Sequence, residues 1–187
     1  MARRSEHSRD EIKQMIFDAA ENIIQERGYS ALKIRQITAD IGYTVASVYM
    51  VFSSMDDLNT QIKARTLRKL IETMAKQENL QDKAKAYCDF ALQEQGLWKM
   101  LFQHQSVKPL DSEVDYVAVR QALELCLATS LQKLKLEATE GESNEASTSL
   151  INAIQGACLS LLWSDAERIE AQIDLLLRCF LDGWRKL

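Results

Sequence analysis

The 187-residue chain has little of several things on which catalytic, secreted and membrane proteins depend. It contains one proline, six glycines and two histidines. No apolar run approaches the ~18 residues that a membrane-spanning helix needs, and the N-terminus lacks the apolar segment of a signal peptide. These absences predict a cytoplasmic protein without a membrane partner. With 47% apolar and 27% charged residues, the scarcity of proline and glycine favours a globular, all-α chain.

The cysteines do not form a recognisable site either. They are widely spaced, each lies in an apolar helical context, and none belongs to a C-x-x-C pair. We therefore predict buried free thiols rather than a metal site or disulfides. The four residues are Cys88, Cys126, Cys158 and Cys179.

Motifs of common catalytic sites are also missing. The chain has no glycine-rich phosphate loop, no H-E-x-x-H and no G-x-S-x-G. Its histidines are His7, in an N-terminal arm, and His104. A cysteine–histidine nucleophile would need His104 beside a cysteine, and nothing in the sequence indicates such a pair. We predict that the protein is not an enzyme and uses no cofactor and no metal.

The net charge of −4 argues against indiscriminate binding to nucleic acids. The charge is uneven, however. Residues 1–69 carry 11 Lys and Arg against 9 Asp and Glu, whereas the remainder carries 12 against 18. A mildly positive N-terminal part on an acidic remainder suits focused contact with DNA.

The most distinctive segment spans residues 34–52. Ile34, Ile37 and Ile41 recur every three or four residues, so they share one face of a first short helix. Gly42 follows at the point where a helix that must stop uses a residue tolerant of positive φ. The pattern predicts a helix that ends in a tight turn.

A second short helix is predicted directly after this turn. Thr44 can cap it with its hydroxyl, and Val48 and Phe52, four residues apart, face the first helix. Two short helices joined by a glycine-containing turn are typical of a helix-turn-helix, whose second helix lies in the DNA major groove. The side chains left on its outer side are Val45, Ala46, Tyr49 and Met50.

Helical periodicity continues along the chain, and we predict about nine helices in two domains. Residues 1–53 form an arm and a three-helix helix-turn-helix domain, whose first helix runs from a capping box at residues 8–11 to Gly28. Residues 54–187 form a helical bundle for ligand binding and dimerisation, and a helix over 54–77 links the two domains. Further helices are expected over residues 80–95, 97–104, 111–136, 145–164 and 167–186, with Gly96 as a break and the acidic stretch 137–144 as a loop.

The last two predicted helices carry wide apolar stripes at helical spacing. These stripes can pack within one subunit, or they can form a four-helix interface between two copies. We favour a homodimer, because one helix-turn-helix reads too few base pairs alone and a two-fold pair doubles the site. The interface residues predicted on this basis are Leu150, Ile154, Cys158, Leu161, Ile169, Ile173, Leu176 and Phe180.

Residues 16–58 resemble the DNA-binding domain of the TetR family of bacterial transcriptional regulators. The likeness covers about a quarter of the chain in the family's order and spacing. The residues that carry it are 16–20, 26–29, 34–37, Gly42, 47–49, Phe52, Ser54 and Leu58. The resemblance implies a homodimer whose C-terminal domains hold a small-molecule pocket, and a ligand that releases the protein from a palindromic operator.

The sequence departs from the family pattern at several positions. Ala46 stands where glycine is common, and Met55 replaces a lysine that usually touches a DNA phosphate. Losing one cationic phosphate contact should lower the salt dependence of binding. Either the affinity is modest, or Arg3, Arg4 and Lys33 compensate.

Side chains on or near the second helix are the predicted DNA contacts. Tyr49 is expected to reach a phosphate, and Thr44 and Ser47 to cap the helix and bond phosphate. Val45, Ala46 and Met50 can contact thymine methyl groups. Arg35 can reach a phosphate or guanine, with an ion pair inside the domain as the alternative. Arg3 and Arg4 can enter the minor groove, and a tail without DNA contacts is the alternative.

A small apolar or amphipathic effector is the remaining expected partner. Its pocket can be lined by five aromatic or polar side chains, Tyr87, Trp98, Phe102, His104 and Trp163. The alternative is that these side chains belong to the ordinary core, as aromatics at helical spacing often do. The competing functional hypothesis is a dimeric protein-interaction module that keeps the fold without binding specific DNA. The missing lysine at Met55 and the acidic C-terminal part motivate it.

Overall fold

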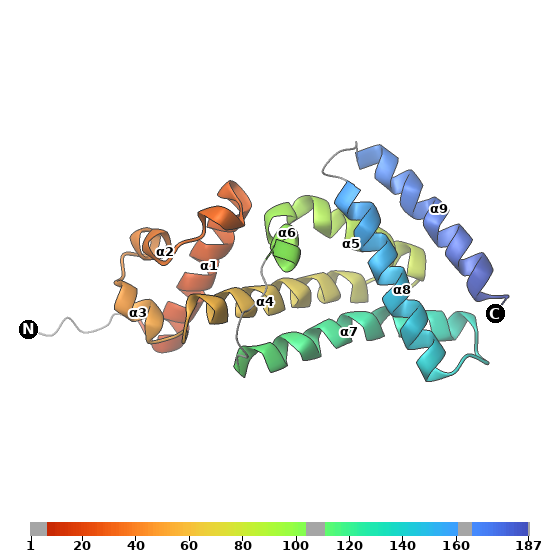
Figure 1. The fold of residues 1–187 in the computed structure, drawn as a ribbon, viewed down its shortest axis with the longest axis horizontal. Helices are drawn as coiled ribbons and strands as arrows, with labels where there is room; N and C mark the ends of the chain where they lie inside the picture. The colour runs from red at the N-terminus through yellow and green to blue at the C-terminus, as the bar shows by residue number, and fades with distance from the viewer. Residues whose placement is uncertain (1–6, 104–110, 161–165, 187) are drawn as a thin grey trace, which may run out of the picture. The chain divides into compact units, whose positions relative to one another are not determined.

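The structure is a computed structural model that describes residues 7–103, 111–160 and 166–186, with only the backbone described for 166–168 (Figure 1). These residues form nine α-helices and one 3-10 helix, which confirms the predicted all-α class. The chain divides into two compact units. The first comprises Met1–Thr66 with Glu94–Tyr116, and the second comprises Leu67–Gln93 with Val117–Leu187. Among the helices described, none combines the length and apolar composition that a bilayer span requires.

Most helices lie where periodicity predicts them. The long helix α4 contributes to both units, and so does α7. The predicted boundary between the DNA-binding and ligand-binding domains, at residue 53, lies at the end of the helix-turn-helix. The two units are defined by contacts instead, so this functional boundary stays a prediction. The elements are α1 (Arg9–Arg27), η1 (Tyr29–Ala31), α2 (Ile34–Ile41), α3 (Val45–Tyr49), α4 (Met55–Ala75), α5 (Leu80–Gln93), α6 (Gln95–Gln103), α7 (Asp111–Leu134), α8 (Glu140–Leu159) and α9 (Ala166–Trp184).

The predicted capping box at the start of α1 is present. The Glu11 N–H donates to Ser8 Oγ at 3.2 Å, and the Ser8 N–H donates to Glu11 Oε2 at 2.6 Å. The hydrogen bonds that the Ser8 backbone N–H and hydroxyl donate to the carboxylate lower the pKa of Glu11, since they favour its charged form. The cap fixes where α1 begins, directly after the N-terminal arm.

The core of the first unit joins α1 to the helix-turn-helix. Phe17 of α1 meets Phe52 edge to face, with ring centroids 5.3 Å apart. Ile37 of α2 and Val48 of α3 are fully buried in the same cluster. Other members come from α1, α4 and α6: Ile16, Ile23, Ile24, Leu58, Ile62, Leu97 and Met100.

Gly96 lies inside α6 and does not break a helix, which corrects the prediction. A Cβ at this position would collide with the Ile24 carbonyl oxygen and the Gln25 main chain of α1. Gln25 Oε1 accepts the backbone N–H of Gly96 at 2.8 Å and that of Leu97 at 3.3 Å, so it caps the first turn of α6. The glycine is therefore required by a close approach of two helices.

The predicted loop over 137–144 is also too long, because α8 begins at Glu140. Thr139 Oγ1 accepts the Glu142 N–H at 3.2 Å, and the Thr139 N–H donates to Glu142 Oε2 at 2.8 Å. This T-x-x-E capping box begins the helix within an acidic stretch. The same hydrogen bonds lower the pKa of Glu142.

In the second unit, α8 and α9 pack side by side and both contact α5 (Figure 1). Most of the predicted interface residues are used in this packing. Leu176 and Phe180 are half-buried, and Leu161 lies outside the described residues. The residues buried within the single subunit are Leu150, Ile154, Cys158, Ile169 and Ile173. These five side chains are covered within the single subunit, whereas Leu176 and Phe180 stay partly accessible.

The cysteines are all free, as predicted, but their burial differs. Cys88 and Cys158 are buried, Cys126 is half-buried and Cys179 is exposed. The prediction of burial is wrong for Cys179, which lies on the outer side of α9.

Replacing Gly96 with alanine is expected to lower the free energy of unfolding by about 1–3 kcal/mol, because backbone atoms of α1 block the added methyl group. Urea denaturation followed by circular dichroism measures this change. Gly141→Ala in α8 is the matched control, since nothing lies within 4 Å of its added Cβ. That variant should gain about 0.5–1 kcal/mol. Equal effects of the two substitutions would contradict the close α1–α6 approach.

Candidate nucleic-acid interface

The turn between α2 and α3 is built on one glycine. Gly42 has φ 71° and ψ 25°, the left-handed conformation that ends a helix. The next residue, Tyr43, donates its backbone N–H to the Thr38 carbonyl oxygen at 3.2 Å. A Cβ on Gly42 would meet nothing within 4 Å. Glycine is needed here for its backbone conformation, which directs the chain into α3.

Thr44 caps α3 as predicted. Its Oγ1 accepts the Ser47 N–H at 3.2 Å, and the two hydroxyl oxygens lie 3.0 Å apart. The helix proper is short, but the Phe52 N–H still donates to the Val48 carbonyl oxygen at 2.9 Å. The helical turn thus extends to the buried phenylalanine, which the predicted 3-4 spacing requires.

The two sides of α3 differ sharply in burial. Val48 is fully buried, whereas the side chains of Val45, Tyr49 and Met50 are 40%, 50% and 73% exposed. Ala46 is exposed on the same side. We call Val45, Ala46, Tyr49 and Met50 the exposed patch. It is open to solvent, as a surface that touches DNA must be.

The predicted cationic contacts are only partly described. Lys33 and Arg35 are exposed at the start of α2. Arg35 forms no ion pair with any acidic side chain in the part of the chain that the structure describes, so the alternative of a pair inside the domain loses support. Arg3 and Arg4 lie outside the described residues.

One contact near the patch has no signal in the sequence. His7 Nδ1 and the Tyr43 hydroxyl form a 2.7 Å hydrogen bond, and the rings meet edge to face with centroids 6.1 Å apart. The last residue of the predicted arm is therefore attached to the turn that precedes α3. Periodicity cannot reveal this contact, because the residues are 36 positions apart.

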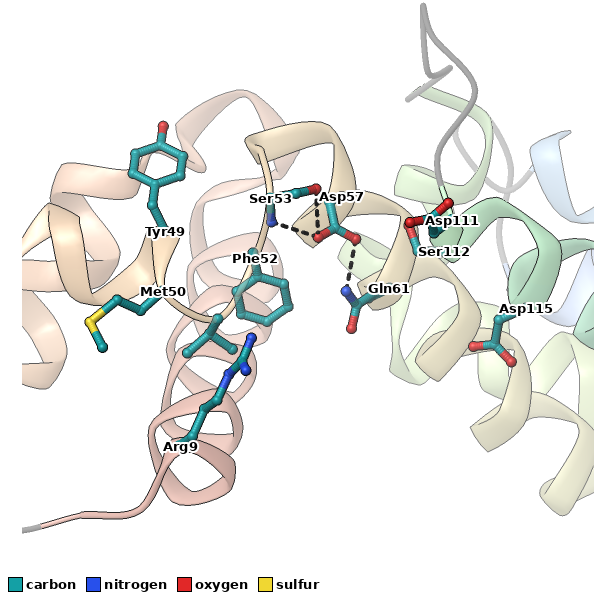
Figure 2. A pocket seen from close by; sticks show the side chains of 11 residues that line it. Arg9, Tyr49, Met50, Phe52, Ser53, Asp57, Gln61, Asp111, Ser112 and Asp115 are labelled. Atoms are coloured by element: carbon teal, nitrogen blue, oxygen red, sulfur yellow. Dashed lines mark hydrogen bonds between the residues drawn. The ribbon is translucent and has the colours of Figure 1, made fainter.

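The segment after α3 is held by Asp57 of α4 (Figure 2). Its Oδ2 accepts the Ser53 N–H at 2.8 Å and the Ser53 hydroxyl at 3.1 Å, and its Oδ1 accepts from Gln61 Nε2 at 2.8 Å. Burial alone would raise the pKa of Asp57, but the hydrogen bonds from Gln61 and Ser53 outweigh it and lower the pKa. Asp57 is therefore charged at neutral pH. Ser54 Oγ accepts the Asp57 N–H at 3.0 Å and so caps the first turn of α4.

An open cavity of about 560 Å³ in the first unit has Tyr49 and Met50 of the exposed patch in its lining. Three carboxylates also line it, from Asp57, Asp111 and Asp115, with Arg9 as a cation. Figure 2 shows Tyr49 and Met50 pointing away from these carboxylates. Negative charge repels phosphate, so the part of the cavity that the carboxylates line disfavours a DNA backbone.

Three of the five predicted ligand residues lie in the described part of the chain. Trp98 and Phe102 form an edge-to-face pair in the first unit, with centroids 5.0 Å apart. Tyr87 is buried and belongs to the second unit. His104 and Trp163 lie outside the described residues.

Comparison with known proteins agrees with this geometry. Residues 16–62 match the model of the family described as bacterial regulatory proteins, tetR family. This match identifies residues 16–62 as a TetR-family DNA-binding domain, in agreement with the resemblance predicted over residues 16–58. No curated protein sequence matches the chain.

Solved structures share the fold of this chain along most of its length. The TetR-family regulator PfmR of Thermus thermophilus is 17% identical, with a TM-score of 0.64 over 87% of this chain and 97% of its own. SCO4454, a TetR-family regulator of Streptomyces coelicolor, is 17% identical, with a TM-score of 0.67 over 94% and 97%. FadR of Bacillus subtilis, solved in complex with stearoyl-CoA, is 17% identical, with a TM-score of 0.69 over 91% and 98%.

Replacing Asp57 with asparagine tests how the segment after α3 is held by α4. At pH 7 we expect a loss of about 1–3 kcal/mol in the free energy of unfolding, since charge-assisted hydrogen bonds to Ser53 and Gln61 are weakened. A lowered folded-state pKa stabilises the fold above the unfolded pKa of 3.8, and this stabilisation disappears as the pH falls through the folded value. The difference between wild type and variant should therefore shrink in acid.

Chemical denaturation at several pH values measures this trend. Asp111→Asn is the control, because this exposed carboxylate lines the same cavity. We expect that variant to change stability by less than about 0.5 kcal/mol at any pH. A constant deficit of Asp57→Asn down to the lowest pH would show that its charge is not what matters.

Proposed function

We propose that this regulator is a repressor that binds a palindromic operator as a homodimer and leaves it when an amphipathic effector binds. The observation that carries the proposal is the exposed patch on α3, opposite the buried Val48. A single short helix reads few base pairs, so two copies related by two-fold symmetry are needed to specify an operator.

Each residue near α3 is assigned a role by its chemistry. The Tyr49 hydroxyl donates to a phosphate, and Lys33 and Arg35 add cationic phosphate contacts. Arg3 and Arg4 reach into the minor groove. The Thr44 and Ser47 hydroxyls bond phosphate while they keep their capping contact. Thymine methyl groups are contacted by Val45, Ala46 and Met50.

The pairing surface is proposed on the outer side of α8 and α9. Leu159 and Leu175 are exposed there, and Leu176 and Phe180 are half-buried. The exposed Gly156 lets a second helix come close. These residues take the place of the predicted stripe residues that the subunit buries in its own packing.

The effector is proposed to bind in the second unit. A cavity of about 240 Å³ between α5 and α9 has the apolar side chains of Leu92, Ile169 and Ile173, with Lys85 and Glu170 among its charged residues. Such a lining suits a small amphipathic molecule or the end of a larger one. FadR, a similar structure, holds stearoyl-CoA, which makes acyl-CoA thioesters the first compounds to test.

Selection from a random duplex library, followed by gel shifts at two salt concentrations, tests the proposal. We expect palindromic selected sites, and loss of the shift when an acyl-CoA effector is added. Absence of any shift at low salt would instead favour the protein-interaction module.

Replacing Tyr49 with phenylalanine should weaken binding to the selected site by about tenfold per subunit, because one phosphate hydrogen bond is lost. Tyr49→Ala should weaken it further. Both should leave the melting temperature nearly unchanged, since half of the side chain is exposed. Fluorescence anisotropy measures the affinity. Leu136→Ala, on a side chain exposed in the second unit, is the control and should bind normally. Normal binding by Tyr49→Ala would place the DNA-contacting face elsewhere.

Restoring the family's lysine at position 55 should strengthen the salt dependence of binding. Met55 is half-buried against the first-unit core, and a lysine there can keep its ammonium group in water. One added phosphate contact steepens the slope of log K against log salt by about 0.9 per subunit. Met55→Gln, with similar length and no charge, should leave the slope unchanged. Equal slopes for both variants would show that position 55 lies out of reach of the DNA backbone.

A further inference from the structure

We propose that Cys88 and Cys158 form a reversible intramolecular disulfide, which makes the second unit a site of thiol oxidation that regulates DNA binding. Formation of the bond requires neither an effector nor a second copy of the chain, whereas its effect on DNA binding rests on the proposed function. It rests on the placement of two thiols that are distant in sequence and adjacent in the fold.

The two sulfurs are already in contact. A hydrogen bond joins the Cys158 and Cys88 thiols, whose sulfurs lie 3.3 Å apart, and the residues are 70 positions apart in the sequence. Cys88 belongs to α5 and Cys158 to α8, two helices that pack against each other in the same unit. A disulfide needs a sulfur separation of about 2.05 Å. The remaining approach of about 1.3 Å is small enough for side-chain rotation and slight helix movement.

The place of Cys158 near the end of α8 makes it easier for the two sulfurs to come together. Cys158 is the penultimate residue of α8, which ends at Leu159. Helix ends have fewer neighbours within the helix than central turns, so they shift at lower cost. Only one partner has to move appreciably.

Solvent access comes from the side of Cys88. Cys88 is 7% exposed and lines the 240 Å³ cavity between α5 and α9, whereas Cys158 is fully buried. An oxidant the size of hydrogen peroxide can therefore enter at Cys88, and the second thiol lies behind it. This order assigns Cys88 as the attacking thiol and Cys158 as the resolving thiol.

The chemistry balances with a peroxide as the oxidant. Cys88 Sγ attacks one peroxide oxygen and the O–O bond breaks, which leaves a sulfenic acid and one water. Cys158 Sγ then attacks Cys88 Sγ, the S–O bond breaks, and the thiol proton leaves with the hydroxyl group as a second water. The two sulfurs lose two electrons in total, and the peroxide gains them. A dithiol reductant reverses the reaction by exchange.

The surroundings of Cys88 set how fast this happens. Its pKa is raised first by the hydrogen bond with Cys158 and then by burial, and the carboxylates of Asp89 and Glu170 act in the same direction. Lys85 and Asp174 line the same cavity. Because the thiolate is the nucleophile, oxidation should be slow at neutral pH and about tenfold faster for each added pH unit below the thiol pKa. Strong oxidant stress, rather than background oxygen, would trigger the switch.

The test uses the full chain with Cys126→Ser and Cys179→Ser, so that Cys88 and Cys158 are the only thiols left. After peroxide treatment we expect both thiols to become unreactive to a thiol reagent in denaturant, and to reappear after reduction. Mass spectrometry of the digested monomer should find the peptides of Cys88 and Cys158 linked. Two free thiols after treatment, or a link between two chains, would overturn the proposal.

A matched variant separates the two steps. With Cys158→Ala added, the sulfenic acid at Cys88 has no resolving thiol, so dimedone should label it. With Cys88→Ala instead, Cys158 should stay unlabelled behind the cavity wall. Circular dichroism confirms that each variant is folded, and labelling of Cys158 at the rate of Cys88 would contradict the assigned order.

The effect of the disulfide on DNA binding is tested by a separate measurement of affinity. The affinity of the pair-only variant for its selected DNA site should change by about fivefold or more between the reduced and oxidised forms. It should not change in the Cys158→Ala variant. Equal affinities of the reduced and disulfide forms would show that the bond has no regulatory role.

Discussion

The burial of Val48 and Phe52 is the constraint on which the exposed patch depends. Both side chains sit in the core that α1 shares with α2 and α4. Because they are four residues apart, burying them fixes the rotation of α3 about its own axis. The opposite side of the helix is then forced outward. The exposed patch is therefore a consequence of core packing and needs no separate device to present it.

A helix as short as α3 is not stable alone in water. It is held at both ends by groups outside its own turn. Thr44 satisfies a free backbone donor at its start, and Asp57 of α4 holds Ser53 just beyond its end. Because the hydrogen bonds to Asp57 also lower its pKa, the charged carboxylate does the holding. The position of the exposed patch is thus coupled to the first turn of α4, which continues into the second unit.

The sequence was sufficient for features encoded by local spacing. The capping box at Ser8, the glycine turn at Gly42 and the buried face of α3 all follow from residues within one or two helical turns of each other. Features set by distant partners were not predictable. Gly96 reads as a helix breaker because the α1 backbone that excludes a side chain there is some 70 residues away.

Apolar stripes and buried cysteines show the same limit in the second unit. Periodicity correctly marks Ile154 and Ile173 as buried, but it cannot say whether the covering surface belongs to the same chain or to a second copy. Only coordinates reveal that their own subunit buries them. Likewise Cys88 and Cys158 look like unrelated core thiols until the packing of α5 on α8 places their sulfurs in contact. The capping box at Thr139 differs, because its T-x-x-E spacing was visible and the acidic composition around it obscured the helix.

The distribution of charge around α3 bears on the proposed way of reading DNA. Non-specific affinity comes from neutralised phosphates, and here Met55 stands where the family has a lysine, while carboxylates line part of the adjacent cavity. The exposed patch itself offers apolar groups and one phenolic hydroxyl, with no cation. In the proposed complex, weak attraction to the backbone leaves discrimination to the fit between the patch and thymine methyl groups, and to the spacing of two paired helices. Losing a phosphate contact weakens every site by a similar factor, so under this proposal the base contacts decide which sites are bound.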